Sequence, residues 1–144
     1  MRTPSTTLIV DAAILVAAVR GRSSGAMLAA AASCQLVTTD RAIAETRRWI
    51  SLGLKRPELL AVLDALSDHL SIVPVAAMAD LVAAAELALR DAVPSRNGTT
   101  GDAHLLATAW ALDADLWSPD RDFAGTGIAS WSTANLMRAL TASA

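Results

Sequence analysis

Five acidic residues are the groups in this 144-residue chain whose types and spacing could do chemistry. Each lies where a strand is expected to end or within the first turns of an expected helix; they are Asp11, Glu45, Asp102, Asp120 and Asp122. Carboxylates that meet repel one another and raise one another's pKa values, unless a cation binds between them. An all-oxygen ligand set selects Mg²⁺ or Mn²⁺ over zinc, and carboxylates around such ions can hydrolyse phosphodiesters. The acids therefore predict metal-dependent phosphodiester hydrolysis.

Each acid, taken alone, also has a structural explanation. Asp11 could cap the helix that follows it, and Asp102 at the start of a helix is favoured by the helix dipole whatever the function. Glu45 could be a surface residue paired with Arg41, one turn before it, and Arg48, one turn after it. Asp120 fits an ordinary type I turn. The functional interpretation depends on whether the fold brings the acids together.

The elements that must position these acids alternate between strands and helices. Short apolar runs predict five strands, at residues 7–10, 35–38, 71–75, 115–118 and 128–131. The helical stretches include residues 40–53, with Asp40 as the expected N-cap, and residues 102–112. This alternation predicts a single α/β domain over residues 1–144, a three-layer α/β/α sandwich with a parallel sheet. Because ligands bind at the carboxyl ends of the strands in such sheets, the acids are expected to meet there.

Four segments of the sequence resemble the PIN-domain nucleases. Asp11 follows Leu-Ile-Val, Glu45 ends a Thr-Asp-x4-Glu pattern, and Asp102 opens Asp-Ala-His-Leu-Leu-Ala. The segment Trp-Ser-Pro-Asp-Arg-Asp-Phe at 117–123 is the most specific of the four. The resemblance covers about residues 7 to 138, with acids and strands in the same order. Many bacterial single-domain members of this family are the ribonuclease toxins of VapC-type toxin–antitoxin pairs.

The resemblance implies a sheet of about five parallel strands, a homodimer, and Mg²⁺- or Mn²⁺-dependent cleavage of RNA by the toxin of a toxin–antitoxin pair, with an antitoxin protein as partner. By the same likeness the catalytic, metal-binding acids are Asp11, Glu45, Asp102 and Asp120. Asp122 would be an auxiliary metal-binding acid, and Ser118 would take the place of the family's usual Thr or Ser.

The sequence departs from the family pattern at Ala12 and Ala13, where the family usually carries Thr, Ser or Asn. The departure removes a hydrogen bond to the metal cluster, which is expected to affect the catalytic rate more than metal binding. It leaves open an alternative, a weakly active or inactive PIN-like module that binds RNA or an antitoxin.

The composition is that of a folded protein without a membrane span. Hydrophobic residues make up 53% of the chain and charged residues 18%, which excludes disorder as the main state. Charges such as Asp11, Asp80 and Glu86 interrupt every apolar stretch of the length that a membrane span requires. The single cysteine, Cys34, lies in an apolar run and is expected to be a buried thiol. We expect a cytoplasmic protein.

The net charge of −2 excludes a nucleic-acid polyelectrolyte but leaves room for a local basic surface. Eleven of the twelve cationic side chains are arginine (twelve Lys and Arg less the single Lys55), and arginine suits phosphate contacts. Arg121, between two of the acids, is the preferred RNA contact. Arg48, close to Glu45, and Arg22, after the first helix, are further candidates. A solvated arginine face is the alternative interpretation for each of them.

Other side chains are expected to be structural. The four tryptophans are expected to supply core volume instead of stacking on bases, and His104 to be a bystander despite its closeness to Asp102. A receiver-type domain would need a lysine near a strand end, but Lys55 precedes a proline in a loop. A phosphatase with an aspartyl nucleophile would need a second acid where Ala13 stands. Both rival chemistries are therefore disfavoured.

Overall fold

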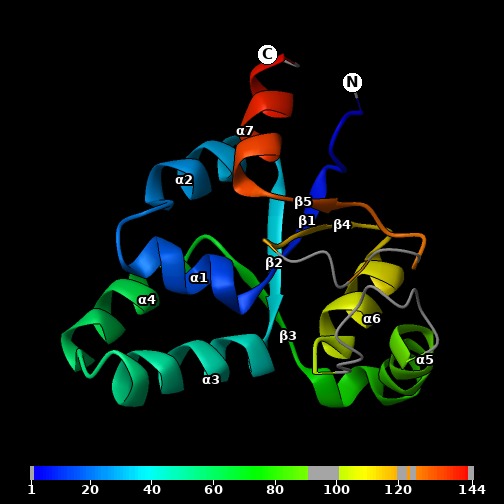
Figure 1. Ribbon diagram of the computed structural model, residues 1–144, viewed down its shortest axis with the longest axis horizontal. Helices are drawn as coiled ribbons and strands as arrows, with labels where there is room; N and C mark the ends of the chain where they lie inside the picture. Colours follow the sequence, from blue (N-terminus) through cyan, green and yellow to red (C-terminus); the bar gives the residue numbers. More distant parts are fainter. Residues whose placement is uncertain (1, 91–100, 120–122, 124–125, 143–144) are drawn as a thin grey trace.

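The computed structural model describes residues 2–90, 101–119, 123 and 126–142. These residues form one five-stranded, fully parallel sheet with the strand order β3-β2-β1-β4-β5 (Figure 1). The strands are β1 (Thr7–Val10), β2 (Gln35–Thr39), β3 (Ser71–Val73), β4 (Asp115–Trp117) and β5 (Ser130–Trp131). The first strand in the sequence is therefore the central one. The predicted parallel sheet of about five strands is confirmed.

Seven α-helices in the described part of the chain cover both faces of the sheet. Helices α1 to α4 and α7 lie on one face, and α5 and α6 lie on the other (Figure 1). Their bounds are α1 (Ala12–Val19), α2 (Ser24–Ser33), α3 (Asp40–Arg48), α4 (Leu60–Ser67), α5 (Ala79–Arg90), α6 (Ala103–Leu112) and α7 (Thr133–Ala142). The structure is thus the predicted three-layer α/β/α sandwich.

The strands are apolar on both faces because both faces are buried. Successive side chains of β1 alternate between two cores: Leu8 and Val10 pack with α1, α2, α4 and α7, and Ile9 packs with α5 and α6. All three side chains are completely buried. Continuous apolar character in a short run, instead of alternation, is what allowed the central strand to be predicted.

Two predicted boundaries were wrong. The N-cap of α3 is Thr39, whose hydroxyl accepts the Ala42 N–H at 3.0 Å; Asp40 instead accepts the Val75 N–H at 3.0 Å and so ties α3 to the segment before α5. Strand β3 ends at Val73 and not at residue 75, because Pro74 has no N–H to donate to a neighbouring strand. A 3-10 turn, Val75–Met78, follows directly.

The helix predicted over residues 40–53 is α-helical to Arg48 and then continues as a π-helical turn, Trp49–Gly53. Further along the chain, Pro57–Leu59 forms a 3-10 turn that leads into α4. No helix in the described residues is both long enough and apolar enough to cross a membrane.

Candidate functional site

Asp11 lies at the carboxyl end of the central strand and is almost completely buried, with 5% of its surface exposed. Its carboxylate accepts two hydrogen bonds. Oδ1 accepts the Ala13 N–H at 3.2 Å, and Oδ2 accepts the Ser118 hydroxyl at 2.6 Å. Asp11 therefore caps α1, which was the alternative interpretation of this residue, but the cap uses only one carboxylate oxygen, Oδ1. Since each oxygen has two lone pairs, the capped carboxylate can still bind a cation.

Ser118 follows β4 and is buried beside Asp11. The parallel pairing of β1 with β4 aligns Val10 with Trp117, so the residues that follow them, Asp11 and Ser118, also lie side by side. Ser118 is the position at which the family resemblance predicted a Thr or Ser. Its hydroxyl supplies a side-chain hydrogen bond to Asp11 that Ala12 and Ala13 cannot make.

Glu45 lies in the second turn of α3, close enough to Asp11 for the two negative charges to interact. Partial burial raises the pKa of Glu45 above 4.5, and the negative charge of Asp11 raises it further, while Arg41 and Arg48 act in the opposite direction. Within the described residues, neither arginine comes within 4.0 Å of Glu45 to form an ion pair. The described part of the structure therefore does not contain the expected surface ion pair of Glu45 with Arg41 or Arg48.

Asp102 is the N-cap residue of α6, so the helix begins one residue later than predicted. The Asp102 side chain is partly buried. Helix α6 leads through two residues into the start of β4, so its N-terminus must lie at the opposite, carboxyl edge of the sheet. This topology places Asp102 at the same edge as Asp11. Asp120, Arg121 and Asp122 lie outside the described residues.

The described residues do not complete a metal-binding cluster on their own. Across residues 2–90, 101–119, 123 and 126–142, no three His, Cys, Asp or Glu side chains lie close enough together to hold a metal ion. The fold places Ser118 in contact with Asp11, places Glu45 close enough to Asp11 for their charges to interact, and places Asp102 at the same edge of the sheet. The donors present are carboxylate oxygens with mutual repulsion, which is the chemistry that a hard divalent cation fits.

His104 is the residue that the sequence analysis assigned no role. It lies in the first turn of α6, completely buried, with Nδ1 2.8 Å from the Thr39 hydroxyl and Nε2 4.0 Å from Oε1 of Glu45. Burial, followed by the positive charge of Arg41, lowers the pKa of His104 to about 4, although Asp40 acts in the opposite direction. The imidazole is therefore neutral at pH 7. The available signal was its position two residues after Asp102.

The comparison with known proteins decides the family. A family model described as the PIN domain matches residues 9–141. The chain belongs to the PIN domain family. A search of curated proteins found no sequence match.

Solved structures with the same fold include chains from two toxin–antitoxin complexes. A chain of the VapBC2 structure from Rickettsia felis, bound to a DNA fragment from its promoter, matches with a TM-score of 0.70 and 16% identity, over 88% of this chain and 98% of that one. A chain of a toxin–antitoxin complex from Klebsiella pneumoniae matches with a TM-score of 0.59 and 20% identity, over 88% and 97%. This PIN domain therefore shares its fold with these chains over almost their whole length.

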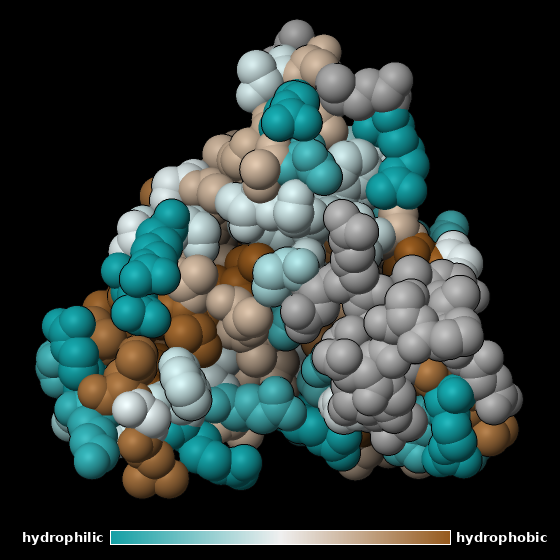
Figure 2. All heavy atoms as spheres, viewed as in Figure 1, coloured by the Kyte–Doolittle hydropathy of each residue, from teal (hydrophilic) through white to brown (hydrophobic). Residues whose placement is uncertain are grey.

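The surface next to Glu45 in this PIN domain carries a positively charged side chain, Arg48, and an aromatic ring, Trp49. Glu45, Arg48, Trp49 and Leu52 line an open depression of about 450 Å³. Trp49 is 50% exposed, so its predicted place in the core was wrong, whereas Trp117 and Trp131 are buried as expected. The Trp49 ring lies against Gly53, where a Cβ would be only 2.6 Å from the ring. Figure 2 shows further hydrophobic surface nearby, over α4.

The other predicted RNA contacts differ in their position. Arg22 is exposed, but it follows the C-terminal end of α1, about 12 Å of helix away from Asp11. Arg48 is exposed one turn from Glu45 and has no ion-pair partner among the described residues. We call the carboxyl edge of the sheet, with Asp11, Glu45 and Asp102, the acidic edge. The structure therefore brings Arg48, but not Arg22, to the acidic edge.

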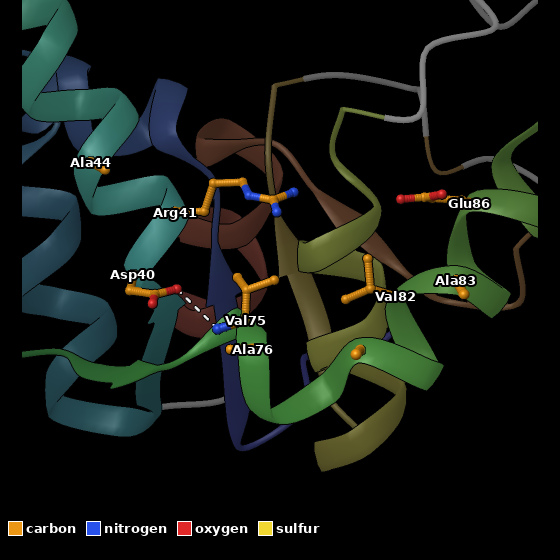
Figure 3. Close-up of a pocket in the computed structure, with 9 residues that line it drawn as sticks. Asp40, Arg41, Ala44, Val75, Ala76, Val82, Ala83 and Glu86 are labelled. Atoms are coloured by element: carbon orange, nitrogen blue, oxygen red, sulfur yellow. Dashed lines mark hydrogen bonds between the residues drawn. The ribbon is translucent and has the colours of Figure 1, made fainter.

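A second groove, of about 600 Å³, lies between α3 and α5 (Figure 3). The Arg41 side chain reaches into it from α3, and Glu86 stands on the opposite side, on α5. The charge of Arg41 opposes the rise in the pKa of Glu45 and, after burial, contributes to the lowered pKa of His104. Arg41 is therefore close enough to the acidic edge to influence its charge state.

Replacing Ser118 with Ala is expected to destabilise the metal-free protein by about 1.5–3 kcal/mol, because the buried Asp11 carboxylate loses a charge-assisted hydrogen bond. Urea unfolding in the presence of EDTA measures this difference. Ser118→Thr keeps the hydroxyl and is the matched control, expected to lose less. Equal stability of Ser118→Ala and the wild type would mean that this hydrogen bond does not hold Asp11.

Protonation of His104 is expected to destabilise the metal-free protein. Between pH 6.5 and about 4 the unfolded chain binds a proton at His104 that the folded protein does not. The free energy of unfolding therefore falls as the pH drops through this range, by about 3 kcal/mol from this residue. Urea unfolding between pH 7 and pH 4.5 should give a steeper dependence for the wild type than for His104→Gln, which cannot titrate. Parallel curves would contradict the assignment.

Proposed function

We propose that this PIN domain is a Mg²⁺- or Mn²⁺-dependent endoribonuclease. The proposed catalytic, metal-binding acids are Asp11, Glu45, Asp102 and Asp120, with Asp122 as an auxiliary ligand. The observation that carries the proposal is the carboxylate of Asp11, buried and held by two hydrogen bonds at the carboxyl end of the central strand. Glu45 lies close enough to interact with its charge: partial burial raises the pKa of Glu45, and the negative charge of Asp11 raises it further. Such an arrangement is stabilised by a divalent cation, and family membership supports a nuclease reaction.

The residues of this chain would contribute to the reaction mainly by orientation. A cation held by these acids supplies a water of lowered pKa and neutralises charge on the scissile phosphate. The Ser118 hydroxyl and the first turn of α1 hold both oxygens of Asp11, so that this ligand is oriented before metal binds. Glu45, with 42% of its side chain exposed, can adjust its position when a cation enters.

RNA would approach along the exposed side of α3. The Arg48 guanidinium has no competing partner among the described residues, and the exposed face of Trp49 beside it offers a surface on which a base can stack. Arg121, between Asp120 and Asp122 in the sequence, remains a proposed contact at the scissile phosphate.

The proposed biological role is that of the toxin in a toxin–antitoxin pair, with an antitoxin protein as partner. It is supported by the two structural neighbours, which come from toxin–antitoxin complexes. A homodimer and a cytoplasmic location, both expected from the sequence, stay predictions. The second candidate function, an RNA- or antitoxin-binding module of low activity, is favoured by Ala12 and Ala13, which lack the family's usual polar side chain.

The test of the nuclease is cleavage of a panel of labelled RNAs in Mg²⁺, Mn²⁺ or EDTA. We expect the wild type to cleave only with metal, and Asp102→Asn to lose activity by orders of magnitude while staying folded. Asp113→Asn is the matched control, because it makes the same change at the exposed C-terminal end of the same helix. Normal cleavage by Asp102→Asn would remove Asp102 from the site. Mn²⁺ binding without cleavage would favour the binding module.

The contact between Arg48 and RNA is expected to appear as a change in salt dependence. Arg48→Ala should reduce the slope of log K against log salt concentration by about 0.7, since one contact to single-stranded phosphate is lost. Fluorescence anisotropy with a labelled RNA in EDTA measures binding without cleavage. Arg138→Ala removes an exposed arginine on α7 and is expected to leave the slope unchanged. Equal slopes for all three proteins would remove Arg48 from the RNA-binding surface.

A further inference from the structure

The buried His104 side chain has one satisfied ring nitrogen and one unsatisfied one. Nδ1 lies 2.8 Å from the Thr39 hydroxyl, but Nε2 has no hydrogen-bond partner among the described residues. The side chain is 1% exposed, so bulk solvent does not reach this nitrogen. Buried polar atoms without a partner are rare in folded proteins and call for an explanation. The nearest acidic oxygen recorded for Nε2 is Oε1 of Glu45, at 4.0 Å.

The hydrogen bonds of Thr39 indicate which ring nitrogen carries the proton. The Thr39 oxygen already accepts the Ala42 N–H at 3.0 Å, where it caps α3, and its own hydrogen is free to be donated to Nδ1. A ring that accepts at Nδ1 carries its hydrogen on Nε2. The opposite tautomer would direct the Nε2 lone pair toward the Glu45 carboxylate, which is repulsive. Both arguments favour an Nε2–H directed at Glu45.

The distance between the two side chains is too long for a hydrogen bond but can be closed by Glu45 alone. The Nε2 to Oε1 separation of 4.0 Å exceeds an N–H to oxygen hydrogen bond by about 1 Å. His104 is buried in α6 and held by Thr39, whereas Glu45 is 42% exposed on α3 and has three rotatable side-chain bonds. A small change in the rotamer of Glu45 would therefore bring its carboxylate within reach of Nε2.

We propose that His104 is a positioning residue for the metal site: its Nε2–H donates a hydrogen bond to one carboxylate oxygen of Glu45 and orients the other toward the cation. The inference rests on the proposed function, because it requires that Glu45 binds metal. The hydrogen bond links α6, which begins after Asp102, to α3, which carries Glu45, and so sets two of the proposed ligands relative to each other. Loss of such a hydrogen bond to a metal ligand typically lowers metal affinity by about 10- to 100-fold.

The test is calorimetric Mn²⁺ binding to the full chain after removal of metal with EDTA. His104→Asn places an amide near the Nδ1 position, where it can still contact Thr39, but reaches no farther; we expect about 10- to 100-fold weaker binding. His104→Gln places an amide N–H near the Nε2 position and is expected to restore most of the affinity. In a Glu45→Ala background, His104→Asn should have no further effect, because the proposed acceptor is removed.

Spectroscopy of the unaltered protein keeps the proposal testable if a variant does not fold. The chain has only two histidines, so the imidazole NMR signals of His104 can be separated from those of the exposed His69. We expect His104 to be the Nε2–H tautomer, and addition of Mg²⁺ to shift that proton downfield while His69 stays unchanged. An Nδ1–H tautomer, or a His104 signal that does not respond to saturating Mg²⁺, overturns the proposal.

The outcomes separate this inference from the proposed function. A wild type that binds neither Mn²⁺ nor Mg²⁺ removes the metal site itself, and the inference with it. A wild type that binds metal, together with a His104→Asn variant of equal affinity, leaves the nuclease proposal standing and overturns the role of His104. Equal losses in the Asn and Gln variants that persist in the Glu45→Ala background would mean that His104 is only structural, which also overturns it.

Discussion

The fold depends on a carboxylate buried at the end of the central strand. Asp11 is 5% exposed, and a charged group at such a position destabilises the folded protein unless hydrogen bonds compensate it. The compensation comes from the N-terminus of α1 and from Ser118 at the end of β4. The second of these bonds requires the parallel register in which Val10 lies beside Trp117. The pairing of β1 with β4 and the orientation of Asp11 are therefore one structural feature.

The same edge of the sheet joins helices from opposite layers. Helix α3 begins where β2 ends, and α6 begins next to Asp102, so both N-termini face the edge that carries Asp11. Thr39 connects them, because its hydroxyl caps α3 and also contacts His104 of α6. Glu45 then extends from α3 toward the same place. The acidic edge is thus assembled from three elements that are each anchored by buried hydrogen bonds.

The similarity to the two toxin–antitoxin structures lies in the fold, since only 16% and 20% of residues are identical. At this level of identity, most core side chains can change while apolar volume and pattern are kept. Ser118, beside Asp11, is a polar position whose side chain has a specific role. It supplies a hydroxyl at the end of β4 in a chain that has two alanines directly after Asp11.

The sequence by itself determined the elements and their order, because short apolar runs and helical spacing are local signals. It also determined that Asp11 ends a strand and that Glu45 and Asp102 lie near helix starts; Asp120, Arg121 and Asp122 are known only at this level. Family motifs located Ser118 but could not show which atom it contacts. Only the tertiary structure decided the hydrogen bond from Ser118 to Asp11, the cap at Thr39 instead of Asp40, the exposure of Trp49, and the direction of His104 toward Glu45. Each of these joins residues far apart in the chain or depends on how completely a side chain is covered, and both are set by strand register and layer packing, not by local spacing.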